Sequence, residues 1–275
     1  MSHSVYASRM ANWDNIESRG TVQDRRGSSA RVGGSIGVAG VAVLLLINYL
    51  QTGTVDVQTL AQELNQMQEQ SAHSQTMDTK EFEGVDSYER FASTVLGSTT
   101  DTWASIFEQS NAPTYTPPGF VLFRDATDSR CGGAYAQIGP HYCPADETVY
   151  LDETFFEELQ TRFGASGDVA QAYVIAHEVG HHVQTLLGIE KESVAQELQA
   201  DCFAGLWAFS IRDQGVFNPG EIKEALDAAS AVGDDHIQEI TTGEVHPETW
   251  THGSSEQRVA AFNRGYTSGV LQKCL

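Results

Sequence analysis

An apolar stretch in the second half of the chain contains two histidines four residues apart. It covers residues 169–187, is rich in valine, alanine and leucine, lacks proline and ends at Gly188, so it predicts a helix. Residues four apart share one helix face, so His177 and His181 can both reach one metal ion. Glu178 follows the first histidine and completes the H-E-x-x-H pattern of zinc enzymes that activate water. Buried histidines without partners would be costly, and the alternative of a solvated polar face fits this apolar helix poorly.

A zinc site that performs chemistry needs a third protein ligand and an open position for water. Residues 192–212 predict the next helix, and it carries Glu197 and Asp201 four residues apart. We expect Glu197 to complete the ligand set and Asp201 to hydrogen-bond the outer nitrogen of a ligand histidine. Glu190 and Glu192 remain alternative third ligands. His182 is expected to be structural, because it points about 100° away from the preceding histidine on the helix.

Residues 33–50 form an uncharged apolar segment near the N-terminus. As a helix the segment would be about 27 Å long, close to the hydrocarbon thickness of a bilayer. Arg25, Arg26 and Arg31 precede it, and the positive-inside rule then places the N-terminus in the cytoplasm. We therefore expect a disordered cytoplasmic tail over residues 1–32, a single transmembrane helix over 33–50 and an extracytoplasmic body at the inner membrane. A cleaved signal peptide and a buried core helix are the alternatives.

Charge is distributed unevenly along the 275 residues. Residues 1–50 carry five arginines against three acids, a net charge of +2. The whole chain has a net charge of −21, so the remaining residues carry −23. An acidic body repels phosphate groups, which argues against a nucleic-acid partner.

The four cysteines lack the C-x-x-C spacing of thiolate zinc sites. Cys131 and Cys143 flank a loop that a disulfide could close, which leaves Cys202 to pair with Cys274. Two disulfides fit an extracytoplasmic location, and four reduced, buried thiols are the alternative.

The pattern of apolar residues predicts an α+β domain with a small sheet and a mostly helical second half. A polar, glutamine-rich linker is expected over residues 51–83, and the domain over 84–275. Helices with a break near Gly97 are expected over residues 86–109. Short strands are expected at 120–123, around 135–138 and at 148–151, and further helices at 152–163, 168–188, 192–212, 221–232 and 254–265.

Taken together, these segments resemble the bacterial neutral zinc metallopeptidases, a group similar to the gluzincins. The resemblance spans nearly the whole chain. It rests on Asp24-Arg-Arg26, Cys131-Gly-Gly, Gly139-Pro-His-Tyr-Cys-Pro144, Val149-Tyr-Leu-Asp152, His177 to Gln184, Glu197 to Cys202 and Trp250 to Arg258. The resemblance implies a zincin-like fold and a membrane-anchored, Zn²⁺-dependent endopeptidase acting on proteins or peptides.

The segment from Thr251 to Arg258 is also similar to a T-H-P…R stretch of CAAX-type membrane zinc peptidases. That similarity implies that His252 stabilises the oxyanion and that Arg258 supports it or pairs with an acid near the zinc. The alternatives are a helix cap at residues 254–255 and an ordinary salt bridge. For the whole protein, a catalytically silent zinc-binding module and a zinc amidase acting on cell-wall peptides remain alternative functions.

Overall fold

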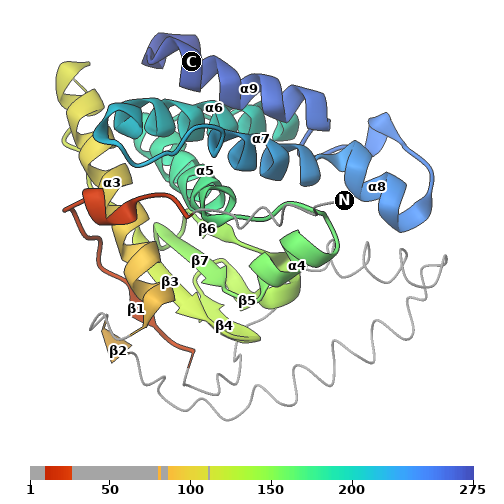
Figure 1. Ribbon diagram of the computed structural model, residues 1–275. Helices are drawn as coiled ribbons and strands as arrows, with labels where there is room; N and C mark the ends of the chain where they lie inside the picture. Colours follow the sequence, from red (N-terminus) through yellow and green to blue (C-terminus); the bar gives the residue numbers. More distant parts are fainter. Residues whose placement is uncertain (1–9, 27–79, 82–85, 111) are drawn as a thin grey trace, which may run out of the picture.

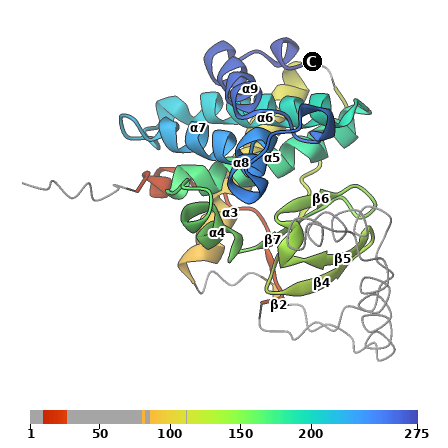
Figure 2. The same cartoon turned by 90° about the vertical axis from the view of Figure 1, so that its right-hand side faces the viewer.

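The computed structural model describes residues 10–26, 80–81, 86–110 and 112–275 (Figure 1). The predicted transmembrane helix over residues 33–50 and nearly all of the predicted linker lie outside the described residues. Among the residues that are described, no helix has the length and hydropathy needed to cross a bilayer. The described part is a mixed α+β structure with helices stacked on one side of a small sheet (Figures 1 and 2).

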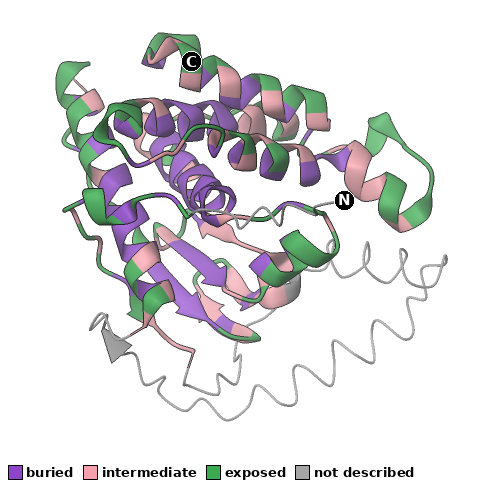
Figure 3. Ribbon diagram, in the orientation of Figure 1, coloured by how far each residue is buried: buried purple, intermediate pink, exposed green. Residues whose placement is uncertain are grey.

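The larger sheet has five short strands, and its centre is a parallel pair. Within this pair Val121 lies opposite Tyr150, and Leu122 lies opposite Leu151. Four consecutive residues of the strand at Gly119–Phe123 are buried, because helices cover one face of the sheet and a β-hairpin covers the other (Figure 3). The strand order is β2 (Lys80–Glu81), β1 (Gln23–Asp24), β3 (Gly119–Phe123), β7 (Thr148–Asp152) and β6 (His141–Cys143), and the hairpin is β4 (Ala126–Ser129) with β5 (Gly132–Tyr135).

Two of the three predicted strands are confirmed, and the third is displaced. The strand predicted around 135–138 ends at Tyr135, and a 3₁₀ turn follows over Ala136–Ile138. The loop then reverses at Gly139, whose positive φ of 80° suits glycine.

The described residues also form seven α-helices. The break predicted near Gly97 is wrong, because the first of them runs through this residue without interruption. Gly97 serves instead as a contact point: a Cβ atom there would lie 2.6 Å from the backbone nitrogen of Arg19. The helices are α3 (Ser87–Gln109), α4 (Phe155–Thr161), α5 (Asp168–Leu187), α6 (Ser193–Ile211), α7 (Ile222–Ala231), α8 (Asp234–Thr242) and α9 (Ser255–Ser268).

Helix α5 lies at the centre of the domain, between the sheet and the helices α6, α7 and α9 (Figures 1 and 3). Glycines allow its neighbours to approach closely. A Cβ atom on Gly180 of α5 would lie 3.1 Å from the Cα atom of Ala200 in α6. A Cβ atom on Gly205 of α6 would lie 2.0 Å from the carbonyl oxygen of Phe262 in α9. These close approaches place polar residues of α6 and α9 beside α5.

Residues 10–26, here called the N-terminal arm, pack against the body of the protein. Trp13, Ile16 and Val22 are buried, and the arm ends as strand β1 beside β3. The indole N–H of Trp13 donates to Asp168 at the start of α5 (2.6 Å). The prediction of a disordered tail over residues 1–32 is therefore wrong for this part, because apolar side chains spaced along a polar segment supply the burial that orders it.

Both disulfides considered from the sequence are formed. Cys131 pairs with Cys143 and fixes the end of β6 to the hairpin, and Cys202 pairs with Cys274 and fixes the C-terminus to α6. The described residues contain no free cysteine, in contrast to the alternative of four reduced thiols.

Candidate metal centre

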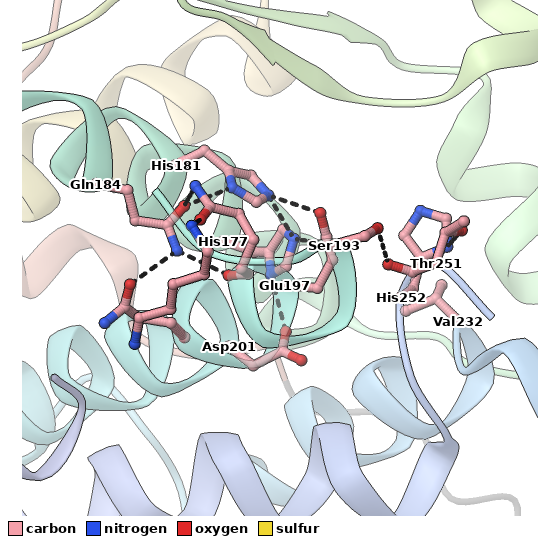
Figure 4. Close-up of polar contacts among 12 residues, drawn as sticks. His177, His181, Gln184, Ser193, Glu197, Asp201, Val232, Thr251 and His252 are labelled. Atoms are coloured by element: carbon pink, nitrogen blue, oxygen red, sulfur yellow. Dashed lines mark hydrogen bonds and ion pairs between the residues drawn. The ribbon is translucent and has the colours of Figure 1, made fainter. Parts of the chain in front are cut away.

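Two adjacent helices bring together His177, His181 and Glu197 (Figure 4). The histidines lie one turn apart on α5, and the glutamate projects from α6. Nε2 of His177 lies 3.2 Å from Nε2 of His181 and 3.1 Å from Oε2 of Glu197. Nε2 of His181 lies 3.4 Å from Oε1 of Glu197. Two imidazole nitrogens and the carboxylate of Glu197 therefore converge on one point.

This donor set fits a zinc ion. Tetrahedral zinc binds histidine nitrogen and carboxylate oxygen at about 2.0–2.2 Å, which places neighbouring ligand atoms about 3.3 Å apart. The three observed separations lie close to that value. Two neutral imidazoles and one carboxylate also form a ligand set typical of zinc hydrolases, with the fourth position left for water.

Glu178 lies beside the ligand set. It follows His177 on α5 and is 7% exposed. Burial alone would lower the pKa of the neighbouring His181. The carboxylate of Glu197 raises this pKa by more, and the negative charge of Glu178 raises it further. A carboxylate in this place can accept a proton from a molecule bound near the histidines.

A buried ionic cluster supports His177 from behind. Its Nδ1 atom lies 2.8 Å from Oδ1 of Asp201, which is fully buried. Arg258 of α9 holds the same carboxylate through Nε and Nη2, each at 2.9 Å, and the hydroxyl of Tyr173 donates to it at 2.6 Å. Burial alone would raise the pKa of Asp201, but Arg258 and His177 lower it to about 2. Asp201 therefore accepts a hydrogen bond from the Nδ1–H of His177, which leaves the lone pair of Nε2 free for a metal.

His181 is supported by an uncharged partner. Its Nδ1 atom lies 2.9 Å from Oε1 of Gln184, which is fully buried. The two histidines thus have different supports, an ionic cluster and a side-chain amide.

His252 lies beyond Ser193 and Thr251 in Figure 4. Its Nδ1 atom lies 3.0 Å from Oδ1 of Asp234, and its ring is about half exposed. Burial opposes ionisation of Asp234, but hydrogen bonds from His252 and from the backbone of residues 251–253 lower its pKa. The hydroxyl of Ser193 donates to the carbonyl of Thr251 (2.6 Å) and joins this loop to the start of α6. Within the described residues, His252 has no direct contact with the three converging side chains.

His182 connects α5 to the edge of the sheet. Its Nε2–H donates to the carbonyl of Thr116 (2.7 Å), so Nδ1 accepts from the hydroxyl of Tyr142 on β6 (3.0 Å). Burial lowers the pKa of His182. This histidine is therefore neutral and structural, and it fixes strand β6 to the helix that carries His177 and His181.

Two residues of the site were not identified from the sequence. Gln184 follows His181 by three residues on the same helix face, which was the available signal. Tyr173 precedes His177 by four residues on the same helix face, which was the available signal there as well. Glu190 and Glu192, the alternative ligands, are not members of the converging group.

The chain matches the family described as "Putative neutral zinc metallopeptidase" over residues 10–275. It belongs to this family. It is 40% identical to the Escherichia coli K12 protein named "Uncharacterized protein YpfJ", over 95% of this chain and 97% of that protein. It is 45% identical to the Mycobacterium tuberculosis H37Rv protein named "Uncharacterized protein Rv2575", over 59% of this chain and 63% of that protein. No solved structure matches the chain.

Proposed function

We propose that this protein is a zinc-dependent endopeptidase. The observation that carries the proposal is the convergence of His177, His181 and Glu197 on one point, with Glu178 beside them. The family to which the chain belongs supports a metallopeptidase. A bound zinc ion supplies a Lewis acid that lowers the pKa of water toward neutrality.

The side chains around the site perform the proton transfers. Glu178 accepts a proton from the attacking water and later delivers it to the leaving amine of the peptide. Asp201, held by Arg258, keeps His177 in the tautomer that presents Nε2. His252, when its imidazole carries both protons, donates from Nδ1 to Asp234 and from Nε2 to the oxyanion of the substrate.

The peptide substrate lies along strand β6. Among the described strands, β6 pairs with β7 alone and ends the larger sheet, so its outer edge offers backbone groups for an added strand. The hydroxyl of Tyr142 on β6 is hydrogen-bonded to His182 of α5, which keeps the edge strand next to the metal ligands.

The localisation is part of the proposal. The apolar residues 33–50 attach the protein to the cytoplasmic membrane, and the body faces the extracytoplasmic side. The two disulfides support that compartment, because disulfides persist outside the reducing cytoplasm.

The test compares the full-length protein with Glu178→Gln, in parallel with Glu157→Gln as a control. Glu157 is an exposed glutamate on α4 and is not a member of the converging group. We expect all three proteins to bind one zinc ion, and only Glu178→Gln to lose cleavage of an unstructured protein, by at least about 100-fold. Wild-type protein that folds without binding zinc would refute the proposal. Zinc in all three proteins with cleavage in none would indicate the silent zinc-binding module instead.

A further inference from the structure

A buried chain of side-chain amides runs from His181 to the C-terminus. Nε2 of Gln184 donates to Oε1 of Gln199 (3.2 Å) and to the carbonyl of Gln196 (2.7 Å). Nε2 of Gln199 donates to the carbonyl of Cys274 (2.8 Å). Gln184 and Gln199 are 0% and 2% exposed, so water cannot readily replace these bonds.

Backbone carbonyls fix the direction of every bond in this chain. A carbonyl oxygen can only accept, so Gln199 must turn its NH₂ group toward Cys274 and its oxygen toward Gln184. The NH₂ group of Gln184 then faces two acceptors, Gln199 and the carbonyl of Gln196. Its oxygen must therefore face His181, and His181 must donate from Nδ1.

We propose that Gln184 is a positioning residue that sets the tautomer of His181, and that the C-terminal peptide sets Gln184 through Gln199. This inference rests on the proposed function, because it assigns His181 as a metal ligand through Nε2. The disulfide between Cys202 and Cys274 holds the C-terminal carbonyl in place, so the disulfide is part of the scaffold of the metal site.

The test uses the full-length protein with Gln184→Met, Gln184→Glu and Gln171→Met. Methionine keeps the volume but accepts only weakly, glutamate keeps the acceptor, and Gln171 lies on α5 away from the metal ligands. Zinc affinity is measured by competition with a chromophoric chelator. The hydrogen-bonded Nδ1 proton of His181 is observed by ¹H–¹⁵N NMR with and without zinc.

We expect Gln184→Met to weaken zinc binding by about 10–100-fold and to lose the His181 Nδ1 proton signal. Gln184→Glu should recover at least part of the affinity, and Gln171→Met should match the wild type. If Gln184→Met does not fold, Gln199→Met takes its place and should show the same direction of change. Unchanged affinity and an unchanged Nδ1 signal in the methionine variant would overturn the proposal. Because the NMR signal is recorded without zinc as well, a wild type that binds no zinc would refute the proposed function and leave this test intact.

A second inference comes from the N-terminal arm. Strand β1 runs parallel to β3, with Gln23 opposite Val121, and the backbone N–H of Arg25 donates to the carbonyl of Leu122 (2.7 Å). At the other end of the arm, the backbone N–H of Ala11 donates to Asp168 (2.8 Å). Such bonds can form only between segments in one compartment.

Arg26, one of the three arginines from which a cytoplasmic N-terminus was predicted, forms ion pairs within the folded domain. The Arg26 side chain is 11% exposed and pairs with Asp24, Asp86 and Glu153. Burial lowers the pKa of this guanidinium, but the surrounding carboxylates outweigh it and raise the pKa. Arg26 is therefore occupied by carboxylates of the domain and does not face lipid headgroups.

We infer that the N-terminal arm and residues 86–275 lie on the same side of the membrane. An arrangement with the N-terminus inside and the body outside would separate β1 from β3. Strands β1 and β2 are neighbours in one sheet, with Asp24 opposite Lys80. The described segments on either side of residues 27–79 therefore belong to the same sheet.

The test places one new cysteine in the full-length protein in cells, either Glu17→Cys in the arm or Glu157→Cys in the body. Both positions are exposed, and the four native cysteines are paired. Each variant is treated with a membrane-impermeant maleimide before and after permeabilisation. We expect the two positions to react to the same extent in both states. Reaction at position 157 in intact cells with position 17 protected until permeabilisation would overturn the inference. Protection of both positions would sustain it and refute the proposed extracytoplasmic location.

Discussion

Replacement of Asp201 by asparagine tests the ionic support of the metal site. The side chain is fully buried and accepts four hydrogen bonds, from His177, from Tyr173 and twice from Arg258. Asparagine has nearly the same shape but no charge, and its NH₂ group must face at least one of these donors. The variant therefore leaves the guanidinium of Arg258, with 4% of its side chain exposed, without a compensating anion.

Two separate losses follow from this geometry. Removal of one partner of a buried ion pair costs about 3–5 kcal/mol of stability, equivalent to a decrease in Tm of roughly 6–20 °C for a domain of this size. Loss of the carboxylate behind a ligand histidine typically weakens metal binding by about 10–100-fold. The first loss comes from the unpaired Arg258, and the second from His177.

The assay measures chemical denaturation without zinc and zinc affinity in the same set of proteins. Asp213→Asn is the control, because its side chain is 89% exposed. Asp201→Asn combined with Arg258→Met removes the unpaired charge, so stability should largely recover while zinc affinity stays low. If Asp201→Asn loses less than about 1 kcal/mol, or if the double variant recovers zinc affinity, the reasoning is refuted.

Three further predictions concern the fold around the site. Trp13→Ala should lower the free energy of unfolding by about 3–5 kcal/mol because Trp13 is buried. Its control Asp14→Ala, at an exposed position, should change it by less than about 0.5 kcal/mol. Equal effects of the two variants in chemical denaturation would show that the arm is not part of the fold. Gly205→Ala should cost at least about 1–3 kcal/mol in the same assay, because its Cβ atom would lie 2.0 Å from the carbonyl oxygen of Phe262, and an unchanged midpoint would contradict this packing. Burial raises the pKa of Glu224 from 4.5 to about 6, so its contribution to stability is present below pH 4.5 and is lost as pH rises through 6. Glu224→Gln should therefore gain stability relative to the wild type as pH rises across this range, and a pH-independent difference in thermal midpoints would count against it.

The convergence of His177 and His181 could be predicted from the sequence because it depends on local spacing. Four residues make slightly more than one helical turn, so H-E-x-x-H on an apolar helix places His177 and His181 on one face whatever surrounds them. The same rule pairs Glu197 with Asp201 on the next helix. The α+β class followed equally directly, because strands and helices have different apolar periods.

The supports of the ligands depend on contacts between distant segments, and only the tertiary structure supplies these. Arg258 reaches Asp201 because glycines let α9 approach α6, and Gln184 is fixed through the carbonyl of Cys274, 90 residues away in the sequence.

The N-terminal arm shows the same limit of sequence reasoning. A polar, arginine-containing segment before an apolar stretch is typical of a disordered cytoplasmic tail, and no local pattern distinguishes it from a folded arm. The sequence alone determined which side chains could bind a metal, because helical geometry is local. The tertiary structure decided what orients those side chains and where the arm lies, because burial, pairing in a sheet and buried ion pairs exist only once distant segments meet.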